Sequence, residues 1–342
     1  MNHVLGVRLD NDGDVLLAGP AVRALAHGAD RVTLLCGPRG RRAAELLPGV
    51  NRLVVWRAPW IDPEPEPVDR AGVDELVDEL AALRLDAAVI FSSFHQSPLP
   101  TALVLRMAGV PFVAATSVDY PGALLDVRHR ISDDVHEVER ALDLAATAGF
   151  PLPPGDDRAL RIRTGAHTAA AAPAGDYVVV HPGASVPARA WAPDANAELV
   201  AALADAGRRV VVTGAPAEIG LTERVAGPPR AEVTNLGGRT GLPELARVLA
   251  GARCVVIGNT GPAHLAAAVG TPVVSLFAPT VPAVRWRPWC VPHELLHVAV
   301  PCAGCRARVC PVFGHPCLGG VAVEDVVAAV DRLAPIGMGA AA

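Results

Sequence analysis

The stretch 256–268 combines an apolar run, a polar turn and an alanine-rich run. Gly261 permits a ligand to approach the backbone closely, and Pro262 suits the first position of a helix, where no N–H is needed. The free N–H groups of that helix, with Thr260 and His264 beside them, favour an anion such as a diphosphate. The alternative is an ordinary strand–helix turn capped by a threonine.

A second polar turn, 9–15, places three aspartates directly after an apolar run. Asp14 could accept a proton from a substrate, and Gly13 allows a second molecule to come close. Asp12 and Asp14 would also suit the N-cap or first turn of a helix, which is the structural alternative. The triplet 10–12 imitates a metal-binding D-x-D motif, but it opens the chain and lacks the later ligands of an EF-hand.

Two turns in the second half of the chain follow apolar runs in the same way. Beyond His181, Ser185 lies in a turn of small residues, and Arg189 could hold a phosphate through its fork of N–H donors. A plain surface arginine is the alternative. Glu218 follows a Gly-Ala-Pro turn, where a carboxylate could bind ribose hydroxyls or simply complement a helix dipole.

Four cysteines lie within one Pro- and Gly-rich stretch: Cys302, Cys305, Cys310 and Cys317. In a cytosolic protein so short a cluster favours a metal over disulfides. Their C-x2-C-x4-C-x6-C spacing, however, fits no standard zinc or iron–sulfur pattern well. The sequence therefore predicts no metal ion, and zinc on these four thiols stays open as an alternative to free thiols or a fortuitous pair.

The composition of the 342 residues limits the class of protein. Hydrophobic residues make up 51% and aromatic residues only 4%, which predicts a core of Ala, Val and Leu. The net charge of -5 argues against nucleic acid as a partner. Every basic residue is Arg, so a lysine Schiff base is excluded. Residues 1–8 do not form a signal peptide and no apolar run could span a bilayer, so we expect a cytoplasmic protein, and a monomer.

Short apolar runs alternate with helical patterns, which predicts parallel α/β sheets covered on both faces. An alanine-rich stretch at 164–175 predicts a linker between doubly wound domains at 1–163 and 176–320, with a helix and tail at 321–342. Facing domains of this kind bind ligands at the carboxyl ends of their strands. The expected strands are 3–9, 31–36, 51–56, 86–91, 111–115, 177–181, 208–213, 232–236, 253–257 and 272–276. The expected helices are 15–27, 39–47, 70–84, 98–108, 135–148, 195–206, 216–226, 242–250, 262–269 and 321–333.

Taken together, these turns resemble the heptosyltransferase family, glycosyltransferase family 9. The resemblance rests on residues 8–20, 181–191 and 258–277 and on their order along the chain. It implies the GT-B fold, in which two Rossmann-like domains face each other across a cleft. The N-terminal domain would bind the acceptor and the C-terminal domain the nucleotide sugar.

The resemblance also implies an activity and a set of site residues. Family members are inverting, metal-independent transferases that move heptose from ADP-heptose to an acceptor hydroxyl and need no further cofactor. The acceptor would be a glycan or a small molecule, and it could hold the enzyme at the periphery of a membrane. The family pattern makes Asp14 the general base and places Arg189, Thr260, Gly261 and His264 on the donor diphosphate. It places Glu218, Asn259 and Ser185 on the donor ribose, base or sugar, and Asp12 and Gly13 on the acceptor side.

Two departures and several alternatives remain at this stage. The family often has Asp in place of Asn259 and Lys in place of Arg189. A sugar-nucleotide epimerase or hydrolase on the same fold is one alternative, and a non-catalytic nucleotide-sugar-binding module is another. A dinucleotide oxidoreductase is disfavoured because no clean G-x-G-x-x-G follows an early strand in either half.

Overall fold

The computed structural model describes residues 1–163, 173 and 175–336. The chain divides into two compact units, Met1–Arg163 and Thr164–Ala342. Each unit is built on one six-stranded parallel sheet. The expected linker at 164–175, apart from residues 173 and 175, lies outside the described residues, as does the tail from residue 337.

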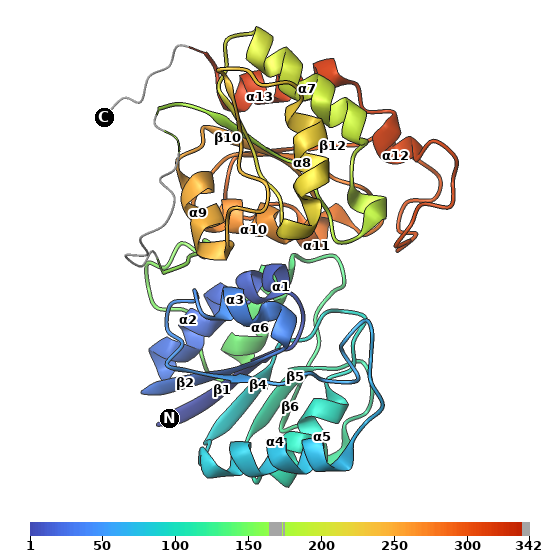
Figure 1. Ribbon diagram of the computed structural model, residues 1–342. Helices are drawn as coiled ribbons and strands as arrows, with labels where there is room; N and C mark the ends of the chain where they lie inside the picture. The colour runs from blue at the N-terminus through green and yellow to red at the C-terminus, as the bar shows by residue number, and fades with distance from the viewer. Residues whose placement is uncertain (164–172, 174, 337–342) are drawn as a thin grey trace. The chain divides into compact units, whose positions relative to one another are not determined.

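The N-terminal unit has the strand order β3-β2-β1-β4-β5-β6. Its strands are β1 (His3–Arg8), β2 (Arg31–Cys36), β3 (Arg52–Val55), β4 (Ala87–Ile90), β5 (Val113–Thr116) and β6 (Val127–His129). Helices α1 (Asp12–Leu17), α2 (Gly19–Gly28), α3 (Arg41–Ala44) and α6 (Glu137–Thr147) cover one face, and α4 (Arg70–Ala82) and α5 (Leu99–Met107) cover the other (Figure 1). Because helices cover both faces, the central strands are mostly apolar, and all six residues of β1 are buried, including His3 and Arg8 at its two ends.

The C-terminal unit repeats this plan with the order β12-β11-β10-β7-β8-β9. Its strands are β7 (Val178–His181), β8 (Val210–Val212), β9 (Val233–Asn235), β10 (Cys254–Gly258), β11 (Val273–Leu276) and β12 (His293–Leu296). Helices α7 (Pro193–Asp205), α8 (Ile219–Ala226) and α13 (Val323–Leu333) pack on one face, and α9 (Leu242–Ala250) and α10 (Gly261–Ala268) lie on the other (Figure 1). Single helical turns, α11 (Ala283–Trp286) and α12 (Pro316–Gly319), lie in the loops after β11 and β12.

Both sheets have a point where the direction of winding reverses. It falls between β1 and β4 in the N-terminal unit and between β7 and β10 in the C-terminal unit. Loops that leave the carboxyl ends of such strands diverge and open a crevice, which is where doubly wound sheets bind ligands. The polar turns of the sequence follow β1, β7, β8 and β10, so they lie at or beside these points.

Each expected strand is present, and two further strands, β6 and β12, were not predicted. Both lie at the edge of a sheet and are only partly buried. An edge strand tolerates polar residues, here Arg128 and Glu294, so it lacks the continuous apolar run that reveals a central strand.

The helix expected at 15–27 is two helices, and that prediction was wrong. Helix α1 ends at Leu17 and α2 begins at Gly19. Pro20 lies in the first turn of α2, and since proline has no N–H it favours a new helix start over the continuation of an old one. The helix expected at 39–47 is also shorter, a 3-10 turn (Pro38–Gly40) followed by the single turn of α3.

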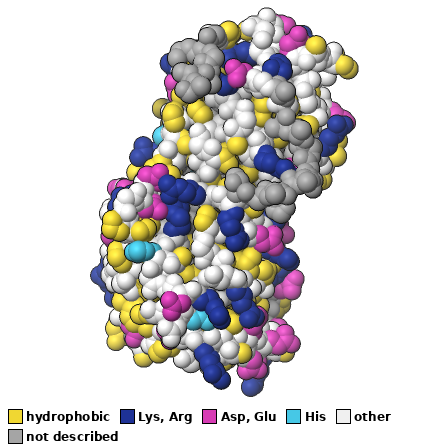
Figure 2. Space-filling view, turned by 90° about the vertical axis from the view of Figure 1, so that its left-hand side faces the viewer, with side chains coloured by type: hydrophobic (Ala, Val, Ile, Leu, Met, Phe, Trp, Pro, Cys, Tyr) yellow, Lys and Arg dark blue, Asp and Glu magenta, His cyan; other side chains and the backbone are white. Residues whose placement is uncertain are grey.

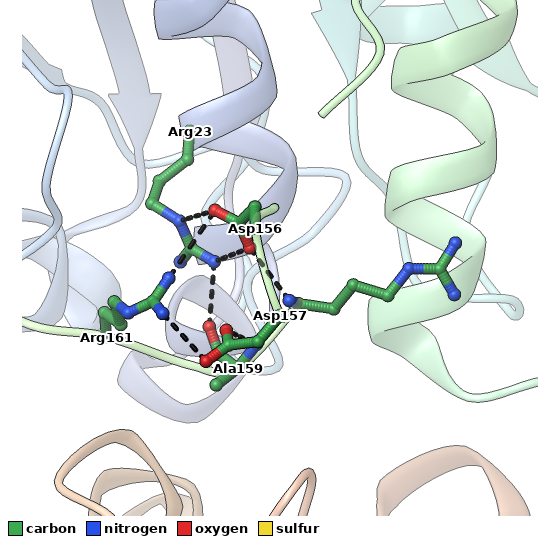
Figure 3. Close-up of polar contacts among 6 residues, drawn as sticks. Arg23, Asp156, Asp157, Ala159 and Arg161 are labelled. Carbon is green, nitrogen blue, oxygen red and sulfur yellow. Dashed lines mark hydrogen bonds and ion pairs between the residues drawn. The ribbon is translucent and has the colours of Figure 1, made fainter. Parts of the chain in front are cut away.

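The last part of the N-terminal unit is held on α2 by a buried ion pair. The Nε and Nη2 atoms of Arg23 donate to the two carboxylate oxygens of Asp156 at 2.9 and 2.8 Å (Figure 3). Nη2 also donates to the carbonyl of Ala159 at 2.9 Å, and Arg161 donates to Asp157 at 2.8 Å on the outside. The hydrogen bonds from Arg23 lower the pKa of Asp156. This pair fixes the path of the chain as it leaves the unit.

On the surface, basic and acidic side chains are interspersed. Figure 2 shows arginine and carboxylate side chains side by side on one face, among apolar ones. The surface also carries exposed ion pairs, such as that of Arg224 with Asp194 at 2.6 Å. Within the described ranges, no helix is both long and apolar enough to cross a membrane.

Candidate active site

Three carboxylates surround the guanidinium of Arg8 where β1 ends. Nη2 of Arg8 donates to Asp14 Oδ1 at 3.0 Å and to Ser93 Oγ at 2.8 Å. Ion pairs join Nε to Asp10 Oδ2 at 3.0 Å and Nη1 to Glu137 Oε2 at 3.6 Å. The Arg8 side chain is only 4% exposed, so these charges interact in a low dielectric. We call Arg8, Asp10, Asp14 and Glu137 the Arg8 cluster.

The carboxylates of the Arg8 cluster differ in their access to solvent. The Asp14 side chain is 20% exposed, against 9% for Asp10 and 3% for Glu137. Burial raises the pKa of Asp10 to about 6, although the charge of Arg8 acts to lower it. Burial also raises the pKa of Glu137. Asp14 is therefore the carboxylate of this cluster that a substrate can best reach.

The neighbouring aspartate, Asp12, points to α3 instead. Its Oδ1 accepts a hydrogen bond from the backbone N–H of Ala43 at 3.1 Å, and its Oδ2 pairs with Arg42 at 2.9 Å. Asp12 thus ties the first turn of α1 to α3. Gly13 follows it and is buried within α1. The expected acceptor-side roles of both residues stay predictions.

In the C-terminal unit, the turns after β7 and β8 meet around Glu218. Its Oε2 accepts a hydrogen bond from the N–H of Ala215 at 2.7 Å, and its carboxylate fills the space that a side chain at Gly183 would need. Nδ1 of His181 lies 2.9 Å from Thr213 Oγ1. Burial lowers the pKa of His181, although the charge of Glu218 acts to raise it. The site therefore presents a carboxylate together with an imidazole whose charged form is disfavoured by burial.

The turn between β10 and α10 lies against the segment that carries Arg189. A Cβ added to Gly258 would be 2.6 Å from the Arg189 carbonyl oxygen, so glycine lets the 3-10 turn Pro187–Arg189 approach. Thr260 precedes α10, but its hydroxyl does not cap the helix. Among the described residues that buried hydroxyl has no hydrogen-bond partner. The threonine-cap alternative is wrong, and the hydroxyl, the helix N–H groups from Gly261 and the buried His264 occur together in this turn.

Two residues expected to bind the donor lie in different surroundings. The Asn259 side chain is buried and pairs twice with the backbone of Ala278, accepting from its N–H and donating to its carbonyl, both at 3.2 Å. Ser185 is exposed on the turn after β7. Asn259 thus joins the turn after β10 to the one after β11, and the donor roles of both residues stay predictions.

Several residues of these sites have no role that is predicted from the sequence. A buried arginine at the end of an apolar strand was the available signal for Arg8. Glu137 reaches the Arg8 cluster from the start of α6, and no local pattern marks it. Thr280 follows β11 and its buried hydroxyl lacks a hydrogen-bond partner within the described ranges. Its place after a strand end, like that of Thr260, could have identified it.

The four clustered cysteines are not grouped as metal ligands in the part of the chain that the structure describes. Cys302 and Cys305 are exposed, Cys310 is half-buried and Cys317 is buried. Throughout residues 1–163, 173 and 175–336, no group of three or more His, Cys, Asp or Glu side chains is placed to hold a metal ion.

Comparison with solved structures defines the class of fold. A glycosyltransferase family 9 structure from Veillonella parvula superposes with a TM-score of 0.76 over 97% of both chains, at 15% identity. The Escherichia coli ADP-heptose heptosyltransferase II gives 0.72 over 97% of this chain and 98% of the other, at 19% identity. An Escherichia coli heptosyltransferase with ADP gives 0.69 over 98% and 99%, at 22% identity. The chain has the GT-B fold, as the sequence predicted.

Comparison of the sequences defines the family. The family model described as glycosyltransferase family 9 (heptosyltransferase) matches residues 94–314. This chain belongs to glycosyltransferase family 9.

Individual relatives are matched over parts of their length. Lipopolysaccharide heptosyltransferase 1 of Escherichia coli K12 is 31% identical over 237 residues, which cover 66% of this chain and 70% of the relative. Lipopolysaccharide heptosyltransferase 3 of the same strain is 36% identical over 116 residues, which cover 33% of each. A second heptosyltransferase 3 is matched over 47% of its length.

Proposed function

We propose that this chain is an inverting glycosyltransferase that moves heptose from ADP-heptose to an acceptor hydroxyl, without a metal ion. One observation carries the donor assignment. The Glu218 carboxylate and the start of α10 both lie beyond the carboxyl ends of strands of one parallel sheet. The carboxylate is suited to ribose hydroxyls, and the start of the helix is suited to a diphosphate. Family membership and the names of the relatives, which are heptosyltransferases, support heptose as the sugar.

In the proposed reaction, Asp14 acts as the general base. Its carboxylate takes the proton of the acceptor hydroxyl while that oxygen forms a bond to the anomeric carbon of the donor. The bond from this carbon to the diphosphate breaks, and ADP leaves with the electron pair. A single displacement of this kind inverts the configuration of the sugar.

Positive charge and N–H donors would stabilise the departing diphosphate. Arg189 supplies a guanidinium, and the start of α10 supplies helix N–H groups with Thr260 and His264 beside them. Fixed donors of this kind stabilise charge that develops in the transition state. We propose that they replace the divalent cation that other nucleotide-sugar enzymes use.

The acceptor and the setting belong to the same proposal. The acceptor is a glycan or a small molecule that presents a hydroxyl group. The proposed enzyme is a cytoplasmic monomer that meets a membrane-bound acceptor at the membrane surface.

Calorimetric titration and product analysis test the proposal together. We expect ADP to bind more tightly than UDP or GDP, and ADP-heptose to release ADP only when an acceptor from a panel of sugars and lipid-linked glycans is present. Preference for UDP would contradict the donor assignment. An epimerised donor, donor hydrolysis without an acceptor, or binding without turnover would each contradict the transferase assignment.

A matched pair of variants tests the base. Asp14→Asn keeps the shape of the side chain and is expected to lower kcat about 1000-fold, the contribution of a general base. Its Kd for ADP should stay within about twofold, less than 0.5 kcal/mol. Asp30→Asn, an exposed aspartate outside both sites, is the control and should leave kcat unchanged. Transfer by Asp14→Asn within a few-fold of the wild-type rate would remove Asp14 as the base.

A further inference from the structure

One buried cation in the N-terminal unit is paired with more carboxylates than its charge requires. Arg8 lies within 3.6 Å of Asp10, Asp14 and Glu137. A buried ion pair already gives little net stability, because both ions lose their hydration. Two additional buried carboxylates add to this cost, which is visible in the raised pKa that burial gives to both Asp10 and Glu137. Stability of the fold therefore does not account for the Arg8 cluster, and a cluster of this kind is a candidate functional site.

We propose that Arg8 is the positioning residue for the base: it fixes one oxygen of Asp14 and so aims the other at the acceptor hydroxyl. This inference rests on the proposed role of Asp14. Within the part of the chain that the structure describes, the hydrogen bond from Arg8 Nη2 to Oδ1 is the interaction that holds the Asp14 side chain. The Oδ2 atom of Asp14 then receives the proton.

Hydrogen bonds from the loop after β4 hold Arg8 itself in place. Ser93 Oγ accepts from Nη2 of Arg8, the same nitrogen that donates to Asp14. The N–H of Ser93 donates to Gln96 Oε1 at 3.0 Å, and Gln96 Nε2 donates to Asp10 Oδ1. The Ser93–Gln96 segment thus contacts both Arg8 and its counter-ion Asp10. Supporting contacts of this kind determine how accurately a catalytic group is aimed.

The other two carboxylates, Asp10 and Glu137, interact with the guanidinium nitrogens that do not contact Asp14. Asp10 pairs with Nε and Glu137 with Nη1, so each nitrogen of the fork faces a different acceptor. Arg140, on the same helix as Glu137, is the second positive charge that acts on Glu137. The orientation of Arg8 is therefore set by partners from the turn after β1, from α1, from α6 and from the loop after β4.

Three substitutions test the role of Arg8. Arg8→Met removes the charge and the fork, Arg8→Lys keeps the charge alone, and Ser93→Ala removes one orienting contact without changing any charge. We expect kcat for ADP release from ADP-heptose, with the acceptor that supports the fastest release, to fall about 100-fold in Arg8→Met. Arg8→Lys should recover part of that loss, and Ser93→Ala should lose about threefold to tenfold.

Binding and folding measurements separate positioning from a structural role. The Kd for ADP, measured by calorimetry, should stay within about twofold in all three variants, because the residues proposed to bind ADP belong to the C-terminal unit. If Arg8→Met does not fold, Ser93→Ala and Arg8→Lys decide the question. Wild-type kcat in both of these variants, or losses of kcat matched by equal losses of ADP affinity, would overturn the inference.

The outcome for Asp14→Asn distinguishes this inference from the proposed function. An active Asp14→Asn enzyme would remove the base itself. An inactive Asp14→Asn enzyme together with fully active Arg8 and Ser93 variants would remove only the positioning role.

Discussion

The carboxylate of Glu218 occupies the space beside the backbone of Gly183 that a methyl group would fill in any other residue. The turn after β7 and the turn after β8 therefore meet with only the Glu218 side chain between them. The absence of a side chain at position 183 is thus what allows the Glu218 carboxylate to lie between these two turns, where we propose that it binds the donor ribose.

Gly183→Ala should displace Glu218 and weaken the binding of ADP. We expect the Kd for ADP to rise at least tenfold, which corresponds to about 1.4 kcal/mol. Calorimetric titration measures this directly. The control is Gly220→Ala in α8, where an added Cβ would meet open space. That variant should bind ADP normally and gain about 0.5–1 kcal/mol of stability, because alanine favours a helix. Unchanged ADP affinity in Gly183→Ala would contradict the placement of Glu218.

Asn259→Asp should destabilise the C-terminal unit. The amide of Asn259 both donates to and accepts from the backbone of Ala278, and a carboxylate can only accept. The change leaves a buried carbonyl facing a buried charge, for which we expect a loss of about 2 kcal/mol in urea unfolding. Asn235→Asp is the matched control, since Asn235 Oδ1 accepts a hydrogen bond from the N–H of Gly237 at 2.8 Å, and a carboxylate oxygen can accept the same bond. Equal losses of unfolding free energy in both variants would show that the two hydrogen bonds between Asn259 and Ala278 are not the cause of the destabilisation.

Asp10→Asn should change how stability depends on pH. Because burial raises the pKa of Asp10 to about 6, the folded state holds this proton more tightly than the unfolded chain, in which aspartate titrates near about 3.9. This group therefore lowers the stability of the wild-type protein as pH rises from about 4 to 6, by an amount on the order of 3 kcal/mol. The variant should lack that decrease.

Urea unfolding at pH 4, 5 and 6.5 compares the Asp10→Asn variant with the wild type. Hydrogen exchange of peptides from β1 and β4 assigns the transition to the N-terminal unit. The free energy of unfolding of the variant should rise relative to the wild type as pH increases. Parallel curves for the two proteins would mean that Asp10 does not hold its proton in the folded state.

Arg23→Ala should destabilise the N-terminal unit and release residues 156–163. The Arg23 and Asp156 side chains are 12% and 8% exposed, and removing Arg23 takes away both of its hydrogen bonds to a mostly buried carboxylate, which keeps only the longer ion pair with Arg161 at 3.5 Å. We expect a loss of about 3 kcal/mol in urea unfolding and faster hydrogen exchange in 156–163. Arg161→Ala is the control, because that side chain is 45% exposed and its ion pairs should contribute less than about 1 kcal/mol. If the control lost as much, the buried pair would not be the main anchor.

The central strands and most helices could be predicted because their patterns are local. The strand at 31–36 and the helix at 242–250 have the predicted boundaries. Buried central strands are apolar on both faces, and amphipathic helices repeat every three or four residues. The edge strands β6 and β12 lack both patterns. The break between α1 and α2 could not be predicted because the apolar periodicity continues past Pro20. The helix itself is interrupted between Leu17 and Gly19.

Turn residues of the candidate site could be predicted for the same reason, whereas their partners could not. Asp14, Glu218 and Thr260 each follow a strand end, and a strand end can be recognised from sequence. Glu137 reaches Arg8 across 129 positions of the chain (137 minus 8), a contact that depends on how α6 packs on the sheet. The pairing of Asn259 with Ala278 depends likewise on the neighbouring positions of β10 and β11.

The bond between Arg23 and Asp156 has a practical consequence for dividing the chain. A fragment that stops before residue 156 would leave the Arg23 guanidinium without Asp156, its counter-ion. One that extends through Arg163 retains the bidentate pair and also the contact of the Arg163 N–H with the Leu46 carbonyl at 2.7 Å. Residues 156–163 are therefore part of the folded N-terminal unit. To express the two units separately, the chain should be divided after Arg163.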